Sequence, residues 1–561
     1  MKNKILYLVL SLSLAGLAGC NDFLDVVPDN RTTIDTPEKI SRLLGTAYSD
    51  RTYMTLLEHR CDGYTDFGST FLGAQPDAAF DNVISGFLWD EFTRSESGND
   101  SYEQYWTASY KAIAVANHAL EAIGQLPDPS VASEQRGEAL VARAYAHFCL
   151  LSMFANLFDT NNMDNNPGIP YVTEPETVVI QRYDRETVAA TLEHIRTDLE
   201  EGLKLIGNAG SYEQPKFHFT RDAALAFGVR VALFTRNYAE AIYYANQLIP
   251  EPSDFFELSY SGGSGVLNED GTPARGVDPN DAANQYMQMN LHDWATYIKS
   301  GNVYQIGMDF TSAKAKANLL LAECSTLIWR EMVGTAYVRH AIDLSTMSDM
   351  LRGNVTGAQW LYLQIAFQWN GGRTVWLPKF YEDFKIDNPV AQTGIPYSKC
   401  PLFRLEEVLL SRAEAYAMQG DAERALADLN MFAATRMKSY KYGPNTLYKD
   451  KVKEYYTMEL KDEGHFINNI YNRSRFLPKA EGEVQKALML TILDFRRMEF
   501  LYEGIRYWDI LRWNIPVTHT TIDGTSSTLT PDDDRRVIQL PLIAETAGIE
   551  LNDMVNTPYP W

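Results

Sequence analysis

The residues of this chain that could do covalent chemistry follow no recognised catalytic spacing. The sequence contains no nucleophile elbow, no metalloprotease HExxH motif, no Walker A loop, no dinucleotide-binding glycine pattern and no EF-hand. Glycoside hydrolysis, however, needs only two positioned carboxylates, and 73 Asp and Glu residues could supply such a pair without any motif. The motifs alone therefore leave hydrolysis open.

Side chains that could bind a metal ion are present but poorly spaced. The loop NEDGTPARGVDPND, residues 268–281, carries carboxylates and amides as calcium sites do, yet its spacing favours a solvated loop. Cys61, Cys149, Cys324 and Cys400 lie far apart without a CxxC or Cys/His pattern, too sparse for a zinc site or a disulfide scaffold. We expect no metal ion and no cofactor.

Aromatic residues, 12% of the chain, offer another chemistry. Rings in loops can stack on the apolar faces of sugars, while Asp, Asn, Gln and Arg bond the hydroxyl groups. The alternative for each ring is burial in the core, where a Trp in an apolar stretch usually lies; we favour packing for Trp376. The candidate ligand-binding residues are Trp89, Tyr64, Asp66, Trp294, Tyr297, Trp329 and Trp369.

The N-terminus predicts export. Lys2 and Lys4 precede an apolar run at residues 5–14, and Leu-Ala-Gly stands directly before Cys20. The run has about half of the roughly 20 residues that span a bilayer, so it is a signal sequence rather than a membrane helix. The LAGC box resembles the bacterial lipobox, which would make Cys20 the lipid-modified first residue; the alternative is an ordinary signal peptide with a chance cysteine.

Charge and composition limit the partners. Lys and Arg number 50 against 73 Asp and Glu, a net charge of -23, and loss of Lys2 and Lys4 with the signal peptide makes it -25. Such a surface repels nucleic acid and anionic lipid, so membrane association must come from the lipid anchor. The hydrophobic share of 45% supports a sizeable core.

Amphipathic helices must position these side chains. Apolar residues recur at helical spacing over 101–126 and 133–158, and again from Arg185, from Arg221 and from Tyr238. The stretch 403–436 repeats the pattern: aligning Arg221 with Arg404 brings the interhelical turns that end at Asn237 and Gly420 into register. With a shift of one further residue, AEAIYY at 239–244 aligns with ERALAD at 423–428. Alanine-rich hairpins of about 34 residues are typical of tetratricopeptide solenoids.

Two stretches lack this regularity. Between about Pro250 and Pro401, glycine- and proline-rich segments and several Trp residues indicate an insertion that carries the variable, ligand-facing surface. A second irregular stretch runs over about 438–488, and helix returns at 494–513.

Together these pieces resemble the SusD/RagB family of Bacteroidetes outer-membrane lipoproteins over most of the chain. The resemblance rests on the lipobox followed by CNDFLDVVPDN, on YWTASYKAIAVANHAL, GEALVARAYAHFCLLSMFANLF and FRLEEVLLSRAEAYAMQGDAERAL, and above all on RRMEFLYEGIRYWDILRW. Arg496 stands where the family often has Glu. We interpret the signature charges as an ion-pair network that holds the last helix on the solenoid. The signature positions are Arg497, Glu499, Glu503, Gly504, Arg506, Asp509, Arg512 and Trp513.

The resemblance implies a mostly α fold: four tetratricopeptide-like units, a SusD-like α-solenoid, with an irregular, loop-rich ligand-binding half. It implies a signal peptide at 1–19, a lipidated tether at 20–36 and one SusD-like domain at 37–561. Within that domain the expected parts are helical repeats at about 101–250 and 403–436, a variable insertion at about 251–400 and a C-terminal helix at 494–513.

The family's function implies a lipoprotein on the outer face of the outer membrane, acting as a lid over a SusC-like TonB-dependent transporter. It would bind an oligosaccharide or polysaccharide and would not be an enzyme. In the family a ligand-stacking Trp falls near Trp89 and acidic residues near Asp66. The alternatives are a peptide-binding RagB-like uptake protein, a surface glycoside hydrolase or peptidase, and a scaffold that makes only protein contacts.

Overall fold

The computed structural model describes residues 34–68, 85–89, 100–176, 182–258, 267–268, 271–334, 339–369, 374–459, 482–531 and 533–553. The predicted signal peptide, Cys20 and all but the last three residues of the predicted tether lie outside these ranges. None of the described helices is long and apolar enough to cross a membrane.

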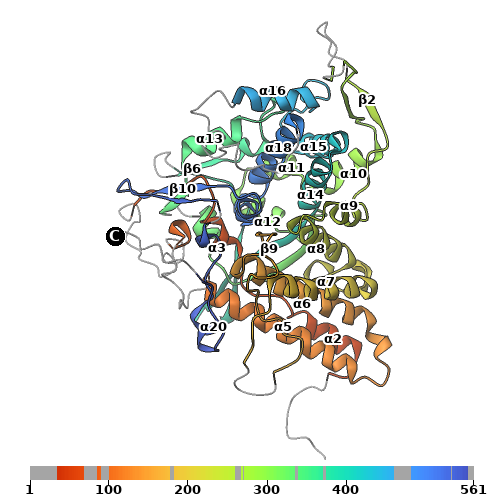
Figure 1. Cartoon of the computed structure of the whole chain (residues 1–561), viewed down its shortest axis with the longest axis vertical. Helices are drawn as coiled ribbons and strands as arrows, with labels where there is room; N and C mark the ends of the chain where they lie inside the picture. The colour runs from red at the N-terminus through yellow and green to blue at the C-terminus, as the bar shows by residue number, and fades with distance from the viewer. Residues whose placement is uncertain are drawn as a thin grey trace, which may run out of the picture.

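Stacked helices form one side of the molecule, rising from α5 at the bottom of Figure 1 to α15 and α18 near the top. Side-chain caps begin several of them: Ser101, Thr187 and Thr220 each accept a hydrogen bond from a backbone N–H of the first turn. This arrangement confirms the mostly α, tetratricopeptide-like fold. The stacked helices are α5 (Tyr102–Gly124), α6 (Ser133–Phe154), α7 (Val188–Leu205), α8 (Arg221–Phe234), α9 (Tyr238–Ala245), α14 (Leu405–Met418), α15 (Ala422–Arg436), α18 (Glu483–Glu499) and α19 (Ile505–Arg512).

The hairpins α8–α9 and α14–α15 are structurally equivalent. Arg221 corresponds to Leu405, one residue later than the Arg404 with which the sequence comparison aligned it. α8 begins at Arg221 and α14 at Leu405 rather than Arg404. Each turn needs one left-handed residue, which is Arg236 (φ 60°) in the first hairpin and Gly420 (φ 82°) in the second. Arginine in this position gives no turn signal in the sequence, which accounts for the slip.

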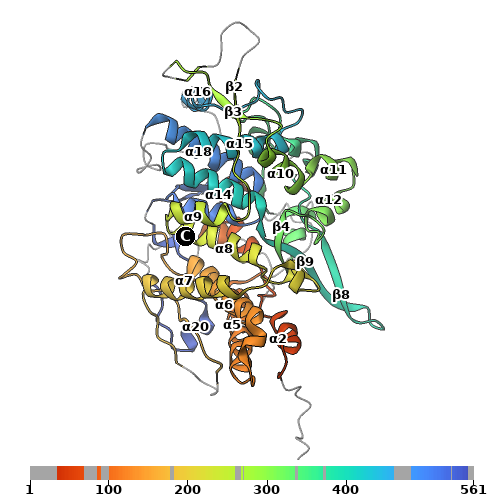
Figure 2. The same ribbon diagram turned by 90° about the vertical axis from the view of Figure 1, so that its right-hand side faces the viewer.

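The second side of the molecule holds short helices and small sheets (Figure 2). Its largest sheet has the strand order β4-β9-β8, with both pairs antiparallel. The other pairs are the hairpins β2–β3 and β6–β7 and the distant pair β1–β5. These elements are β2 (Phe255–Glu257), β3 (Arg275–Val277), α10 (Ala282–Asn290), α11 (Trp294–Lys299), α12 (Val303–Phe310), β4 (Asn318–Cys324), a π-helical turn η5 (Trp329–Gly334), β5 (His340–Ile342), α13 (Leu344–Arg352), η6 (Leu361–Gln364), β6 (Phe367–Trp369), β7 (Thr374–Trp376), β8 (Glu382–Asn388) and β9 (Thr393–Arg404).

The remaining described elements belong to the two ends of the domain and to the region before α18. Among them, β10 and β11 form a short antiparallel hairpin. They are α2 (Pro37–Leu44), α3 (Met54–Glu58), β1 (Tyr64–Asp66), the 3-10 turns η2 (Pro129–Ala132), η3 (Ala209–Ser211), η4 (Pro215–Phe217) and η8 (Asp534–Arg536), α16 (Lys449–Glu459), β10 (Val517–Thr520), β11 (Ser526–Leu529) and α20 (Leu542–Thr546).

The predicted C-terminal helix at 494–513 is wrong as a single element, because the chain breaks between α18 and α19. Tyr502 and Gly504 both have φ 71°, which no α-helix accommodates. A Cβ on Gly504 would lie 3.1 Å from the backbone of Met54, so the glycine also lets α3 approach closely. Glu58 of α3 accepts a hydrogen bond from the Gly504 N–H at 2.9 Å.

Buried ion pairs hold α18 to the solenoid. Glu499 pairs with Arg404 and with Arg436 at 2.8 Å each. Glu503 pairs with Arg404 at 2.9 Å and with Lys379. All these side chains are buried, and removing one partner from such a pair costs about 3–5 kcal/mol because the other charge is left uncompensated.

The other signature residues tie α18 and α19 to distant parts of the chain and to each other. Arg497 and Arg506 both pair with Asp62, near the N-terminal end, at 3.5 and 2.8 Å. Arg512 pairs with Glu414 of α14 at 2.6 Å and with Asp509 at 2.7 Å. Arg496, where the family often has Glu, pairs with Asp509 at 2.8 Å, and Trp513 is buried. These contacts give the signature charges an architectural role.

Candidate functional site

Trp89 lies in the core rather than on a ligand-facing surface. Its side chain is 2% exposed, and its ring stacks on His519 with centroids 4.4 Å apart. The indole N–H donates to the backbone oxygen of Arg60 at 3.2 Å. A ring enclosed in this way presents no face to a ligand in this structure.

Tyr64 and Asp66, in β1, are also buried. The Tyr64 hydroxyl donates to Glu58 at 3.2 Å. Both carboxylate oxygens of Asp66 accept from Arg339, at 2.7 and 2.8 Å. Burial raises the pKa of Asp66, but the Arg339 guanidinium and the Gly68 N–H outweigh it and lower the pKa to about 2. Both polar groups are occupied by the protein itself.

Trp294 and Tyr297 pack into the interior from α11. Trp294 is 0% exposed and stacks on Phe310 with centroids 5.4 Å apart, while Tyr297 is half-buried and lies edge-on to Trp294 at 5.7 Å. Trp369 belongs to β6 and pairs with Thr374, but its side chain is outside the described part.

Trp329 is the predicted residue that joins a surface cluster. It is half-buried at the start of η5, and its ring stacks on Tyr304 of α12, with centroids 6.0 Å apart and an interplanar angle of 26°. Tyr381 meets Tyr304 edge-on at 6.4 Å. Tyr304 is 49% exposed, so a large aromatic face is open to solvent. We call Tyr304, Trp329 and Tyr381 the aromatic platform.

The fold positions the platform through a close backbone approach. Asn302 caps α12 by accepting from the Tyr304 N–H at 2.9 Å, and the side chains of Ile306 and Phe310 are fully buried. A Cβ on Gly307 would lie 2.4 Å from the backbone oxygen of Phe380. α12 therefore rests directly on the chain that leads to Tyr381.

An ion pair links the segment that carries Trp329 to the segment that carries Tyr381. Arg330 follows Trp329, Glu382 follows Tyr381, and the guanidinium donates to both carboxylate oxygens at 2.8 Å. The Arg330 side chain is 48% exposed. The Glu382 side chain is half-buried, at 16% exposed. Aromatic faces beside an exposed guanidinium group and its half-buried carboxylate partner can stack on the C–H surface of a sugar and bond its hydroxyls.

Sequence reasoning missed Tyr304 and Tyr381. The four-residue spacing of Tyr304 and Met308 places them on one face of α12, but only the structure shows that this face is exposed, with 49% and 39% of the two side chains open to solvent. Two large apolar side chains on the outward face of a short helix indicate a surface with a partner or ligand. Tyr381 carries no such pattern, because only the tertiary fold brings it to α12.

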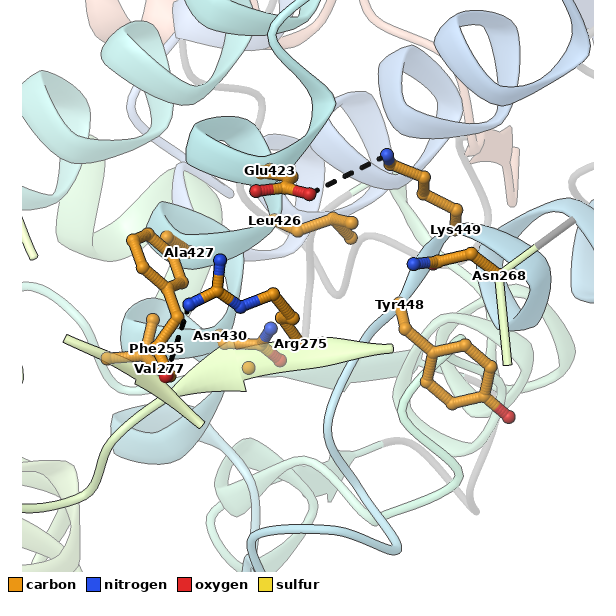
Figure 3. A pocket seen from close by; sticks show the side chains of 11 residues that line it. Phe255, Asn268, Arg275, Val277, Glu423, Leu426, Ala427, Asn430, Tyr448 and Lys449 are labelled. Atoms are coloured by element: carbon orange, nitrogen blue, oxygen red, sulfur yellow. Dashed lines mark hydrogen bonds and ion pairs between the residues drawn. The ribbon is translucent and has the colours of Figure 1, made fainter. Parts of the chain in front are cut away.

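Two small hollows among the described residues offer no comparable site. Figure 3 shows one between the β2–β3 hairpin and α15, where Arg275 lies over Phe255 and Glu423 pairs with Lys449 at 3.9 Å. Its volume is about 10 Å³, and that of a hollow beside Glu331 is about 20 Å³, room for about one water molecule each. Across the described ranges, no three His, Cys, Asp or Glu side chains could share a metal ion.

Two family models match separate parts of the chain. Residues 22–233 match a SusD-like family model described as starch-binding and associating with the outer membrane, and residues 353–535 match the model of the SusD family. The chain belongs to the SusD/RagB family. The two matches cover the N-terminal helical repeats and the signature region of α18 and α19. No curated protein matches the chain in sequence.

Solved SusD structures share this fold at low identity. A SusD superfamily protein from Bacteroides thetaiotaomicron VPI-5482 is 17% identical, with a TM-score of 0.59 over 92% of this chain and 100% of that one. One from Bacteroides fragilis is 16% identical, with a TM-score of 0.58 over 92% and 99%. A SusD-like carbohydrate binding protein from Bacteroides vulgatus ATCC 8482 is 15% identical, with a TM-score of 0.53 over 91% and 96%.

Proposed function

We propose that this protein binds an oligosaccharide on the aromatic platform and hands it to a SusC-like TonB-dependent transporter in the outer membrane. The observation that carries the proposal is the exposed stack of Tyr304 on Trp329, flanked by Tyr381. The three rings come from three segments of the chain, and about half of the Tyr304 side chain is open to solvent. An exposed aromatic cluster of this kind indicates a surface that meets a ligand.

The chemistry of the platform fits a carrier that releases its cargo. A sugar stacked on a ring face buries only a small apolar area, so each such contact is modest and the bound sugar can exchange. Arg330 and Glu382 supply donors and acceptors for sugar hydroxyls. The family relationship and the carbohydrate-binding relative from Bacteroides vulgatus support the choice of sugar over peptide.

The setting of the protein is part of the proposal. Cys20 would carry the lipid anchor, residues 21–36 would serve as a tether, and the domain would face the cell exterior over the transporter channel. The signature carboxylates support a carrier without catalysis, since Glu499 and Glu503 are buried and each is held by two cations. Hydrolysis of a glycan by the purified protein would overturn the proposal that the protein is a carrier without catalytic activity.

Calorimetric titration of purified protein with a panel of neutral oligosaccharides and of peptides tests the platform. We expect at least one oligosaccharide to bind without turnover, and Tyr304→Ala to weaken it about tenfold, a loss of about 1.4 kcal/mol. Tyr243→Ala is the matched control, because Tyr243 is 64% exposed on the solenoid helix α9. Binding of peptides alone would favour the RagB-like alternative. If Tyr304→Ala binds the oligosaccharide with unchanged affinity, the aromatic platform is not the binding site.

A further inference from the structure

Glu331 is a buried carboxyl group on the turn that carries part of the aromatic platform. It belongs to η5, two residues after Trp329 and one after Arg330. The residue is 6% exposed, and neither of its carboxylate oxygens has a hydrogen-bond partner among the described residues. Glutamate is almost never buried unless it is paired, so an isolated buried carboxyl group calls for an explanation.

The side chains that share a small hollow with Glu331 are neutral. The titratable residues in its walls are Tyr64, His340 and Tyr502, and the other walls carry no ionisable group. Burial raises the pKa of both tyrosines. Burial lowers the pKa of His340 well below its usual range, so its ring is uncharged near neutral pH. The hollow has room for about one water molecule, which can accept a hydrogen bond from a carboxylic acid but cannot balance a carboxylate.

Charged groups on the neighbouring elements do not balance a negative charge on Glu331 either. Arg339, which precedes β5, donates to both carboxylate oxygens of Asp66. Glu58 of α3 is another buried carboxyl group, whose pKa burial raises to about 7. Asp100 acts on Glu331 as a like charge. Burial, and after it the charge of Asp100, therefore raises the pKa of Glu331 well above its usual range.

The η5 turn links this carboxyl group to the platform. Its π-helical geometry is rare and often marks a functional site. Asp100 anchors the approach to the turn by accepting from the Leu327 N–H at 2.7 Å, and the Glu331 N–H donates to the Leu327 backbone oxygen at 2.9 Å. Trp329, between these two residues, supplies the ring on which Tyr304 stacks. A displacement of Glu331 therefore moves one ring of the stack.

We propose that Glu331 is a positioning residue that makes ligand binding at the aromatic platform depend on pH. In its neutral form the carboxyl group stays buried and holds Trp329 in place against Tyr304. When its O–H bond breaks and the proton passes to solvent, the carboxylate has no cation to pair with and is drawn towards water, which shifts the turn. Oligosaccharide binding then weakens as pH rises. The inference rests on the proposed function, because the platform must be the binding surface.

Hydrogen–deuterium exchange followed by mass spectrometry tests the turn without any ligand. We expect peptides from residues 326–334 to exchange faster in the unchanged protein than in Glu331→Gln at pH 9, and equally in both at pH 6. Glutamine keeps the shape of the side chain and stays neutral, so the difference reports the effect of the charge. The two proteins are compared at the same pH, which cancels the intrinsic pH dependence of exchange. Equal exchange at pH 9 would overturn the proposal.

Calorimetric titration with the tightest neutral oligosaccharide of the panel tests the link to the platform. We expect the affinity of the unchanged protein to fall about tenfold between pH 6 and pH 9, and Glu331→Gln to keep its pH 6 affinity at both. Glu323→Gln, on an exposed position of β4, is the matched control and should follow the unchanged protein. Glu58 titrates in the same range, but it is present in all three proteins, so the comparison isolates Glu331.

The two measurements separate this inference from the function on which it rests. An oligosaccharide that binds the unchanged protein equally at pH 6 and pH 9, or that loses affinity in Glu331→Gln as well, would overturn the inference and leave the proposed function standing. A panel in which no oligosaccharide binds at either pH would overturn the proposed function, and the link to Glu331 with it, whatever the exchange of the turn shows.

Discussion

His147 is held as a neutral base in the middle of α6. Its Nδ1 lies 2.9 Å from the Arg143 backbone oxygen, and its Nε2 accepts from the Val172 N–H at 3.0 Å. Only the neutral ring, protonated on Nδ1, satisfies both contacts, because a second proton would face the Val172 N–H. Burial lowers the pKa of His147 to about 3.

We therefore expect His147 to make the protein less stable in acid. Between pH 3 and 6.5 the unfolded chain binds the proton and the folded protein does not, so stability falls as pH falls below 6.5, by about 1.4 kcal/mol per pH unit. Urea unfolding gives the free energy of unfolding at pH 7.5 and at pH 5.0. We expect the drop in this free energy between the two pH values to be about 2 kcal/mol smaller in His147→Gln than in the unchanged protein.

The control for this prediction is His118→Gln, which replaces a histidine whose side chain is 53% exposed. An equal pH dependence in His147→Gln and the unchanged protein would mean that other groups account for the acid sensitivity.

At the scale of elements, the break between α18 and α19 depends on Gly504. Alanine there would adopt a left-handed conformation, which costs about 1–2 kcal/mol, and its Cβ would press on the Met54 backbone at 3.1 Å. We expect Gly504→Ala to lower the free energy of unfolding by at least that amount, measured by urea unfolding.

Gly124→Ala, at the end of α5, is the control for this change. A Cβ there meets nothing within 4 Å, and the backbone is helical, so alanine should be neutral or should stabilise by up to about 1 kcal/mol. Equal effects of the two substitutions would contradict the account of the break.

The helical hairpins could be predicted because apolar periodicity is a local property. α5 and α6 begin within one residue of the stretches expected at 101–126 and 133–158. The break at Phe500–Gly504 could not be read from helical periodicity, since its cause is contact with α3, more than 400 residues earlier. The pairing of β1 with β5 likewise joins segments that no local pattern connects.

The ligand surface was harder to predict, for a related reason. Composition and position single out Trp residues, but exposure depends on what packs against them. Trp89 and Trp294 are enclosed by His519 and Phe310, whereas Trp329 shares a surface with Tyr304. Tyr304 and Tyr381 become functional candidates only when Gly307 brings α12 onto the backbone at Phe380.

On the scale of the whole molecule, buried ion pairs connect the solenoid to both ends of the domain. Buried ion pairs around Glu499 and Asp62 fasten the C-terminal helices to both the solenoid and the N-terminal segment. The aromatic platform lies on the irregular half, where α12 rests on the backbone at Phe380.

A crystal structure of the protein with the tightest neutral oligosaccharide of the binding panel would locate the bound sugar. We expect a sugar ring stacked on Tyr304, with Trp329 and Tyr381 beside it and hydroxyls bonded to Arg330 or Glu382. A sugar bound elsewhere, with the aromatic platform left open to solvent, would contradict this expectation.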